Sequence, residues 1–259
     1  MVCRIENLSV GYHAEQPILT IKDFSLSSGD LVFVLGPSGI GKCTLMETLG
    51  LMNETILNPG QAKYAIATSG ETTNIANIWS DSERERTAVR QHISFIFQMS
   101  DLMPQLTVRE NIVMSATELP SKDFDAHICE GLERLGMSRD LLHSEVTRLS
   151  GGQRQRIVFL RALQRKFKLL LGDEPTGNLD QGNARQLMQY LKETIRTSGG
   201  AALVVTHDFA LADLFADRIV YLDDLHPIVD AKSIYFRNEG VWMNDFSTLA
   251  LRMQKTDFS

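Results

Sequence analysis

The sequence predicts an α/β fold in which helices cover a mostly parallel sheet. Five apolar runs of strand length are each bounded by polar or turn residues, at 31–36, 93–97, 168–173, 202–208 and 218–224. Continuous runs of β-branched residues and leucine of this length are typical of strands that are buried on both faces. Helical patterns alternate with these runs, at about 42–51, 124–136, 153–166 and 183–197. Alternating strands and helices indicate a doubly wound α/β core.

Two segments interrupt this alternation. Residues 53–90 are polar, rich in Asn, Thr and Ser, and contain strand-like fragments such as KYAIAT. Residues 99–165 are mostly helical in pattern, which predicts an inserted helical subdomain. Near the C-terminus, the stretch SIYFRNEGVWM predicts a hairpin that turns at 238–240. We therefore expect a main domain over 1–225, followed by a C-terminal hairpin and tail over 226–259.

Composition and charge argue against several classes of protein. A net charge of −6, from 26 basic and 32 acidic residues, argues against a nucleic-acid-binding surface over the whole molecule. Cys3, Cys43 and Cys129 lie far apart with no CxxC pair, so we expect neither a disulfide framework nor a zinc site, as in a reducing cytosol. No apolar run reaches the length of about 18 residues that crosses a bilayer. Work at a membrane would therefore require a partner.

The motif GPSGIGKCT, which begins at Gly36, carries the first chemical signal. It lies between a predicted strand and a predicted helix, where Gly36, Gly39 and Gly41 let backbone N–H groups converge on phosphate oxygens. Lys42 adds a positive charge for the terminal phosphates. The alternative is an ordinary glycine-rich turn. The usual hydroxyl residue after the lysine, which helps to hold Mg²⁺, is replaced by Cys43, whose place at a helix N-terminus beside Lys42 predicts a lowered thiol pKa.

A second signal is the acidic pair that ends the strand in KLLLGDEPTGNLD. Asp173 stands at the carboxyl end of this strand, where open α/β sheets bind ligands, and its carboxylate suits a hydrated Mg²⁺. Glu174 can orient and deprotonate an attacking water. Such a pair is often only solvated surface, but the phosphate-binding loop favours the catalytic interpretation.

A third signal is the sequence LSGGQ directly before a predicted helix. Ser150, Gly151 and Gly152 offer a hydroxyl, free N–H groups and a helix N-terminus, which together suit an anion. The alternative is a simple serine N-cap followed by glycines. A simple kinase or GTPase needs only one phosphate site, so a second one requires an explanation.

Taken together, these motifs resemble those of the ATP-binding-cassette (ABC) ATPases over about residues 2–225. GPSGIGKCT resembles the Walker A loop of that family, LSGGQ its signature and LLLGDE its Walker B strand. The resemblance implies a P-loop ATPase core with an N-terminal antiparallel β-subdomain and an inserted helical subdomain. It also implies that ATP and Mg²⁺ are the cofactors.

The resemblance also assigns roles to individual residues. It implies that Glu174, the switch-like His207 and the Q-loop-like Gln98 are catalytic. Gln98 and Asp173 would hold the metal, with Cys43 as a poor third ligand. The residues that would contact ATP are Tyr12, which would stack on adenine, and Gly36, Pro37, Ser38, Gly39, Ile40, Gly41, Lys42, Cys43, Thr44, Ser150, Gly151, Gly152, Gln153 and Asp180.

The second anion site has an explanation within this family. In ABC ATPases two cassettes pair head to tail, and each signature caps the ATP held by the Walker A loop of the other chain. The stretches DEPTGNLD and FQMSDLMPQLTVRENI look most like the lipoprotein-release, macrolide-export and cell-division branch. The resemblance therefore implies a homodimer on the cytoplasmic face of a membrane that drives an integral membrane permease, with no nucleic acid as partner.

Other functions agree with parts of the pattern. An ABC ATPase that acts on DNA or the ribosome usually carries coiled-coil insertions or two cassettes, and this chain has neither heptads nor a second Walker A motif. A binding-only regulatory cassette is suggested by Cys43 alone. Tyr12 and His207 also have structural explanations, as a core tyrosine and a packed histidine. One apolar pattern is either core or the edge of the groove that receives the permease in relatives: Leu102, Met103, Leu106, Val108 and Ile112.

Overall fold

The computed structural model of the 259-residue chain describes residues 1–13, 15–67, 72–97, 102–116, 123–223, 227–238, 241–243 and 249. Its strands are β1 (Cys3–Val10), β2 (Leu19–Leu26), β3 (Leu31–Leu35), β4 (Lys63–Ala67), β5 (Thr72–Asn74), β6 (Ile93–Ile96), β7 (Leu169–Asp173), β8 (Ala201–Val205), β9 (Arg218–Tyr221), β10 (Ile228–Val229), β11 (Ile234–Asn238) and β12 (Val241–Trp242). Its α-helices are α1 (Lys42–Leu49), α2 (Glu83–Arg90), α3 (Val108–Val113), α4 (Phe124–Arg134), α5 (Gly151–Gln164), α6 (Gln181–Ser198) and α7 (Phe209–Phe215). Short 3₁₀ helices span Ile78–Ser80, Arg139–His143 and Val146–Arg148.

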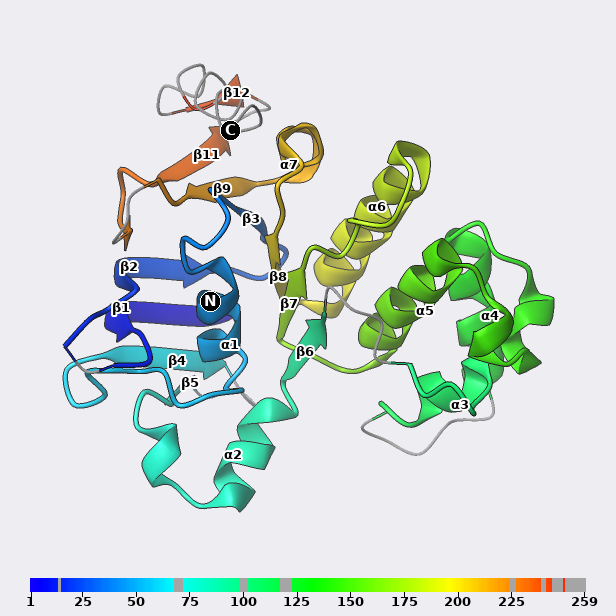
Figure 1. Ribbon diagram of the computed structural model, residues 1–259, viewed down its shortest axis with the longest axis horizontal. Coiled ribbons are helices and arrows are strands. Elements are labelled where there is room, and N and C mark those ends of the chain that lie inside the picture. The colour runs from blue at the N-terminus through cyan, green and yellow to red at the C-terminus, as the bar shows by residue number, and fades with distance from the viewer. Residues whose placement is uncertain are drawn as a thin grey trace.

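A seven-stranded sheet forms the centre of the molecule, in the order β12-β11-β9-β3-β8-β7-β6 (Figure 1). The strands from β9 to β6 are parallel to one another, whereas β11 and β12 join in antiparallel pairs. All five predicted core strands are present in this sheet. The prediction of an α/β fold with a mostly parallel sheet is therefore confirmed.

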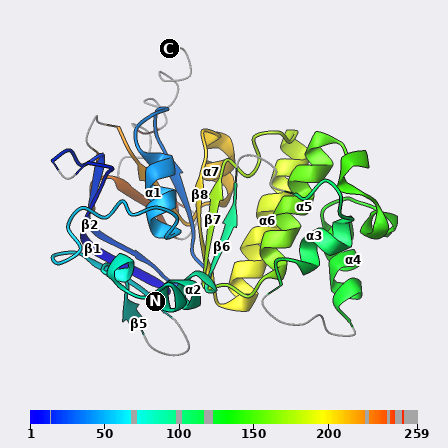
Figure 2. The same ribbon diagram turned by 60° about the horizontal axis from the view of Figure 1, so that its bottom comes forward.

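The core lies on both faces of this sheet because its strands are apolar throughout. Along β3, Leu31, Phe33 and Leu35 pack into one hydrophobic cluster, and the alternate residues Val32 and Val34 pack into the other. Successive side chains of a strand point to opposite faces, so an unbroken apolar run requires cover on each side. In Figures 1 and 2, α3 to α6 lie on one side of β6–β8, and α1 and β1 lie on the other.

A second sheet covers the α1 side, in the order β10-β2-β1-β4-β5. Its pairs are antiparallel except for β10 with β2. Its largest fully buried side chain is Tyr64, whose hydroxyl donates to the Leu49 carbonyl at the end of α1 over 2.6 Å. The polar segment 53–90 supplies β4, β5 and α2, so its strand-like fragments were correctly predicted. This antiparallel sheet is the one that the resemblance implied.

The helical region begins after β6. Its helices start at identifiable caps: Thr107 with Glu110 caps α3, and Ser150 with Gln153 caps α5, each as a reciprocal capping box. Since that box begins at Ser150, α5 starts at Gly151, two residues before the predicted start at 153. Leu160 and Ile157 of α5 are fully buried in the cluster that covers the sheet.

At the C-terminal end, β11 and β12 pair where the hairpin was predicted, although its turn lies outside the described residues. Arg237 of β11 stacks over the ring of Trp242 with 4.5 Å to the centroid. Trp242 Nε1 donates to Asp213 of α7 over 2.7 Å. None of the described helices is long and apolar enough to cross a membrane. The division at residue 225 stays a prediction.

Candidate functional site

The loop between β3 and α1 has the backbone of a phosphate cradle. Gly36, Gly39 and Gly41 adopt φ values of 153°, 79° and 103°, which residues other than glycine rarely adopt. A Cβ atom at Gly36 would also lie 2.3 Å from the Leu222 carbonyl oxygen, and one at Gly41 would lie 2.6 Å from Ile18 Cγ2. These glycines are therefore required by the loop shape as well as by the predicted ligand.

Lys42, the first residue of α1, folds back over this loop. Its Nζ donates to the carbonyl oxygens of Gly36 at 2.6 Å and Pro37 at 2.7 Å. Burial lowers the pKa of this ammonium group, while Glu174 and Asp173 act in the opposite direction. The charge is thus held by two neutral oxygens beside two carboxylates, a position from which it can turn to a phosphate.

A cavity of about 520 Å³ opens over the loop. It is lined by Gln16, Pro17, Ile18, Ser38, Gly39, Ile40, Gly41, Lys42, Cys43, Thr44, Asp173, Glu174 and Val205. The structure therefore brings the glycine loop and the acidic pair, which lie far apart in sequence, around one cavity. Sequence reasoning missed Gln16, Pro17 and Ile18, because nothing in their pattern marks them as neighbours of the loop.

Glu174 and His207, two residues with predicted catalytic roles, lie together in the structure. The Glu174 Oε1 atom is 3.0 Å from His207 Nδ1. The Glu174 side chain is 14% exposed and that of His207 is 75% exposed. Glu174 has a φ of 47°, and its N–H donates to the Val205 carbonyl over 3.0 Å. A positive φ is uncommon for a residue with a side chain, and such outliers cluster at functional sites.

Sequence reasoning missed Thr206, which holds the other oxygen of the same carboxylate. Thr206 is buried, and its Oγ1 donates to Glu174 Oε2 over 3.2 Å. A threonine after an apolar strand has no distinctive pattern, so only the tertiary structure identifies it.

Tyr12 lies at the surface. It is 54% exposed, and its hydroxyl donates to Glu47 Oε2 of α1 over 2.8 Å. Glu47 also accepts a hydrogen bond from Asn53. The alternative of a core tyrosine is therefore wrong, and an exposed ring is free to stack on a flat ligand.

Residues 19–177, more than half of the chain, match the ABC transporter family. The chain belongs to the ABC transporter family. It is 35% identical over 228 residues to the lipoprotein-releasing system ATP-binding protein LolD of Ruegeria sp. (strain TM1040), covering 85% of this chain and 95% of that relative. It is 36% identical over 225 residues to LolD of Maricaulis maris (strain MCS10), covering 86% and 93%.

A solved structure agrees with this assignment. The dimeric ATP-binding cassette MJ0796, in a post-hydrolysis state bound to ADP and Pi, superposes with a TM-score of 0.68 at 27% identity. The match covers 87% of this chain and 96% of that one. The resemblance drawn from the motifs is therefore confirmed, and the chain is an ABC ATPase.

In the ABC signature of this chain, Ser150 and Gln153 form hydrogen bonds with each other. The Ser150 hydroxyl accepts from the Gln153 N–H over 3.2 Å, and Gln153 Oε1 accepts from the Ser150 N–H over 2.8 Å. A Cβ atom at Gly151 would meet nothing within 4 Å, so the start of α5 is open to an approaching group. None of 150–153 is among the described residues that line the cavity. The structure thus leaves the two predicted anion sites of one chain separate.

The loop that follows Glu174 connects the two regions. The buried Gln155 of α5 donates from Nε2 to the Pro175 carbonyl over 3.0 Å. Asp180 caps α6 by accepting from the Asn183 N–H over 2.9 Å, and these hydrogen bonds lower its pKa. Gly152 faces the side chain of Leu179. The signature helix and the loop from Glu174 to Asp180 therefore pack as one unit.

One sequence-based expectation about the ABC motif residues is wrong. Burial and the nearby Asp173 carboxylate raise the pKa of the Cys43 thiol, and the opposing charge of Lys42 has a smaller effect. The sequence predicts a lowered pKa because local pattern does not reveal that Asp173, from a distant strand, lies beside the thiol. Cys43 is nonetheless exposed.

The donor set of this ABC site fits a hydrated Mg²⁺. Asp173 supplies a carboxylate in the cavity, and no group of three or more His, Cys, Asp or Glu residues that could hold a metal occurs among the described parts of the chain. Mg²⁺ usually takes one or two protein carboxylates, with substrate phosphates and waters completing its octahedron. The other predicted ligand, Gln98, lies outside the described residues.

Proposed function

We propose that this ABC ATPase binds Mg²⁺-ATP in the cavity over the glycine loop, works as a pair and drives a separate membrane subunit. The observation that carries the proposal is the arrangement of Lys42, Asp173 and Glu174 around one cavity of about 520 Å³. A cationic group, a metal-binding carboxylate and a carboxylate base are the three groups that phosphoryl transfer to water requires. Tyr12 would stack on the adenine ring from its exposed position.

Each residue then has a distinct task. Lys42 would leave its two carbonyl partners and donate to the terminal phosphates. Asp173 and Gln98 would hold Mg²⁺, which neutralises charge on the phosphate oxygens. Glu174, at the end of β7, would accept a proton from the attacking water. His207 would contact the γ-phosphate once ATP is present.

The pairing of two chains follows from the separation of the anion sites. The open N-terminus of α5 at Gly151 has hydrogen-bond donors but does not line the cavity of its own chain. A second chain placed head to tail would bring its Ser150 and Gly151 over the ATP of the first. The similarity to MJ0796, which was solved as a dimer, supports this arrangement.

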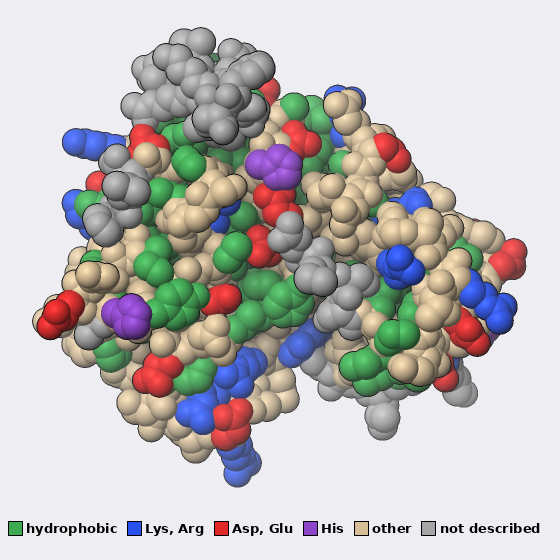
Figure 3. Space-filling model, viewed as in Figure 1, with side chains coloured by type: hydrophobic (Ala, Val, Ile, Leu, Met, Phe, Trp, Pro, Cys, Tyr) green, Lys and Arg blue, Asp and Glu red, His purple; other side chains and the backbone are tan. Residues whose placement is uncertain are grey.

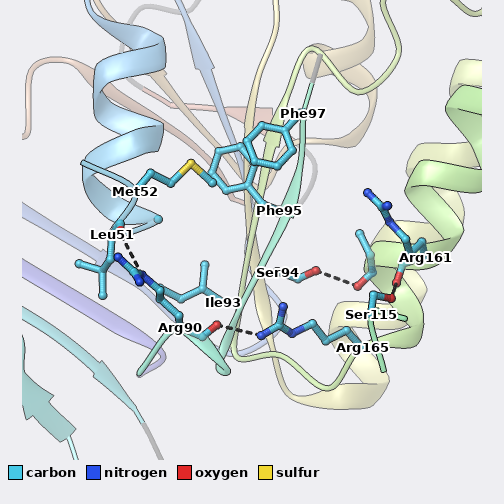
Figure 4. A pocket seen from close by; sticks show the side chains of 12 residues that line it. Leu51, Met52, Arg90, Ile93, Ser94, Phe95, Phe97, Ser115, Arg161 and Arg165 are labelled. Carbon is cyan, nitrogen blue, oxygen red and sulfur yellow. Dashed lines mark hydrogen bonds between the residues drawn. The ribbon is translucent and has the colours of Figure 1, made fainter. Parts of the chain in front are cut away.

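The membrane subunit would dock in a groove beside β6. A second cavity, of about 680 Å³, is lined by Gly50, Leu51, Met52, Arg90, Ile93, Ser94, Phe95, Phe97, Ser115, Arg161, Ala162 and Arg165. Figure 3 shows the surface hollowed between the part that carries α1 and α2 and the helices α3 to α5. In Figure 4, Phe95 and Phe97 pack together beside Met52 on one wall, and Arg161 and Arg165 from the end of α5 form the other.

The lining of this groove defines the chemistry of its occupant. One wall is aromatic, with the Phe95 and Phe97 ring centroids 4.4 Å apart. The other wall is cationic, and the described lining residues include no carboxylate. Burial lowers the pKa of the Arg165 guanidinium, and its Nε is buried without a hydrogen-bond partner in the described structure. An amphipathic helix with apolar side chains and one acidic side chain would satisfy both walls.

The cellular task is inferred from relatives. LolD proteins that share about 35% identity over most of this chain are named as parts of lipoprotein-releasing systems. We therefore place this chain on the cytoplasmic face of a membrane, where residues 1–225 form the cassette and 226–259 a hairpin and tail. ATP would close the pair and hydrolysis would open it, so that the permease extracts or exports a lipid-bearing substrate.

The Glu174→Gln variant tests the proposed function. It removes the base but keeps the hydrogen-bonding shape, so turnover should fall by about a hundredfold or more while ATP binding persists. Size-exclusion chromatography with light scattering should then detect an ATP-dependent dimer. Glu193→Gln, on the exposed side of α6, is the matched control and should behave as wild type. A strict monomer of Glu174→Gln at high protein concentration with ATP, alone and with the membrane partner, contradicts the pairing.

Cys43 favours a second candidate, a cassette that binds ATP without hydrolysing it. A thiol is a poorer Mg²⁺ ligand than a hydroxyl. Co-purification of the membrane partner from detergent extracts, followed by ATPase assay of that complex, separates the two. Equal inactivity of wild type, Cys43→Ser and Glu174→Gln in the complex would establish the binding-only function.

A further inference from the structure

The carboxylate of Glu174 is held by two neighbours that differ in solvent exposure. Thr206 Oγ1 donates to Oε2 over 3.2 Å, and His207 Nδ1 lies 3.0 Å from Oε1. Thr206 is 1% exposed, whereas the His207 side chain is 75% exposed. One oxygen of the carboxylate is therefore attached to the core and the other to a side chain at the surface.

The Thr206 hydroxyl both accepts and donates a hydrogen bond. Its oxygen accepts the N–H of Asp208 over 3.1 Å, and a backbone N–H has no other role than donor. The single hydroxyl proton therefore remains for Glu174 Oε2. By donating to Oε2, the Thr206 hydroxyl fixes the direction in which the Glu174 carboxylate points.

The backbone of Thr206 is also attached to the sheet. Its N–H donates to the Val34 carbonyl of β3 over 3.3 Å, and Val205 before it accepts the N–H of Glu174. Hydrogen bonds thus attach Thr206 to the strand that precedes the glycine loop and hold its neighbour Val205 to Glu174. These hydrogen bonds connect Glu174 to the strand that leads into the glycine loop.

We infer that Thr206 is a positioning residue for hydrolysis, which keeps the Glu174 carboxylate aimed at the attacking water when His207 leaves it for the γ-phosphate. The inference rests on the proposed function. Without Thr206, a carboxylate on a backbone with a φ of 47° would lose the only buried side-chain donor that it has among the described residues. Thr206 is not among the described residues that line the cavity, so its substitution should leave the binding of ATP unchanged.

The test compares Thr206→Val with Thr206→Ser in the ATPase complex. Val has the same shape without the hydroxyl, so kcat should fall by about ten- to a hundredfold, as expected for the loss of a hydrogen bond to a charged group. The KM for Mg²⁺-ATP and the Kd of a fluorescent ATP analogue should stay within about twofold of wild type. Ser keeps the hydroxyl and should restore most of kcat.

A second variant separates the carboxylate contact from support of α7. Asp208→Ala removes the cap that accepts the Leu211 N–H over 2.8 Å and leaves the bond from Thr206 to Glu174 in place. It should lower the melting temperature with little change in kcat. Three results would overturn the inference: unchanged kcat in Thr206→Val, equal slowing in Thr206→Ser, or equal slowing in Asp208→Ala.

These results are distinguishable from failure of the proposed function. If this chain were not an ATPase, wild type would show no turnover in the complex while still binding the analogue. If only the inference were wrong, wild type would turn over and Thr206→Val would match it.

Discussion

Leu102 and Met103 are adjacent in the chain but lie in opposite environments. Leu102 is 8% exposed and belongs to the hydrophobic core, whereas Met103 is 48% exposed. The buried Asn111 holds this arrangement, because its Oδ1 accepts the Met103 N–H over 2.7 Å and its Nδ2 donates to the Met103 carbonyl over 3.1 Å. Each interpretation of the apolar pattern therefore applies to different residues. Val108 and Ile112 belong to the core with Leu102, whereas Met103 lies at the surface.

Met103→Glu should weaken attachment of the membrane subunit. A charge at this exposed position disturbs no core contact, so basal ATPase and melting temperature should stay near wild type, while stimulation by the partner falls several-fold. Leu102→Glu is the contrasting variant. A charge in the core should destabilise the protein by about 3 kcal/mol or more and reduce both activities. Partner recovery, ATPase and thermal unfolding measure the difference, and equal loss in the two variants would mean that Met103 is also structural.

Arg165→Glu should weaken binding of the membrane subunit, because it reverses the charge of one wall of the groove. Its guanidinium is half-buried in the groove and its Nη2 donates to the Arg90 carbonyl over 3.1 Å. Reversing the charge should reduce recovery of the membrane subunit about tenfold at low salt, whereas Arg165→Lys should retain most of it. Lys232→Glu, an exposed position before β11, controls for net charge. If Arg165→Glu and wild type recovered equal amounts of the membrane subunit, the segment bound in the groove would carry no acidic side chain opposite Arg165.

Cys43→Ser should increase the affinity of the site for Mg²⁺. A hydroxyl is the ligand that a hard cation prefers, and position 43 shares the cavity with Asp173. We expect the half-saturating Mg²⁺ concentration of ATPase to fall several-fold and kcat to be as high as that of wild type or higher. Titration of ATPase with Mg²⁺ at fixed ATP measures both. A Cys43→Ser enzyme that is slower at saturating Mg²⁺ would contradict a ligand role for this position.

Cys43 and Cys3 should differ in their reaction with a maleimide. Cys43 is exposed and should be labelled first in the folded protein, more slowly once ATP fills the cavity. Cys3 is fully buried, which raises its pKa to about 12, so it should be labelled only after unfolding. Mass spectrometry of peptides from native and denatured samples reads both. Labelling of Cys43 that ATP does not slow would place the nucleotide away from α1.

Local pattern alone predicted the core strands and the helix that follows the glycine loop. The run at 168–173 was expected as a strand and is β7 from Leu169 to Asp173. Lys42 was expected at a helix start and is the first residue of α1. Both predictions succeed because glycine spacing and apolar runs of this length are specified by residues within a few positions of one another.

Boundaries and solvent exposure were predicted less well. The pattern at 102–112 has the same apolar spacing whether a residue faces core or solvent, so the contrast between Leu102 and Met103 could not be derived from it. It depends on Asn111, whose side chain is directed to the loop by the fold. Likewise, the pKa of Cys43 depends on Asp173, a residue from a strand far along the chain.

The sequence by itself identified Lys42, Asp173 and Glu174 as candidates for phosphate chemistry. Only the tertiary structure decided what surrounds them. Parallel pairing of β7 with β8 places Asp173 opposite Val205, which brings Thr206 and His207 to the Glu174 carboxylate. A strand's own residues encode its apolar character, but its neighbour in the sheet is selected by packing of the whole core, which short-range pattern does not contain.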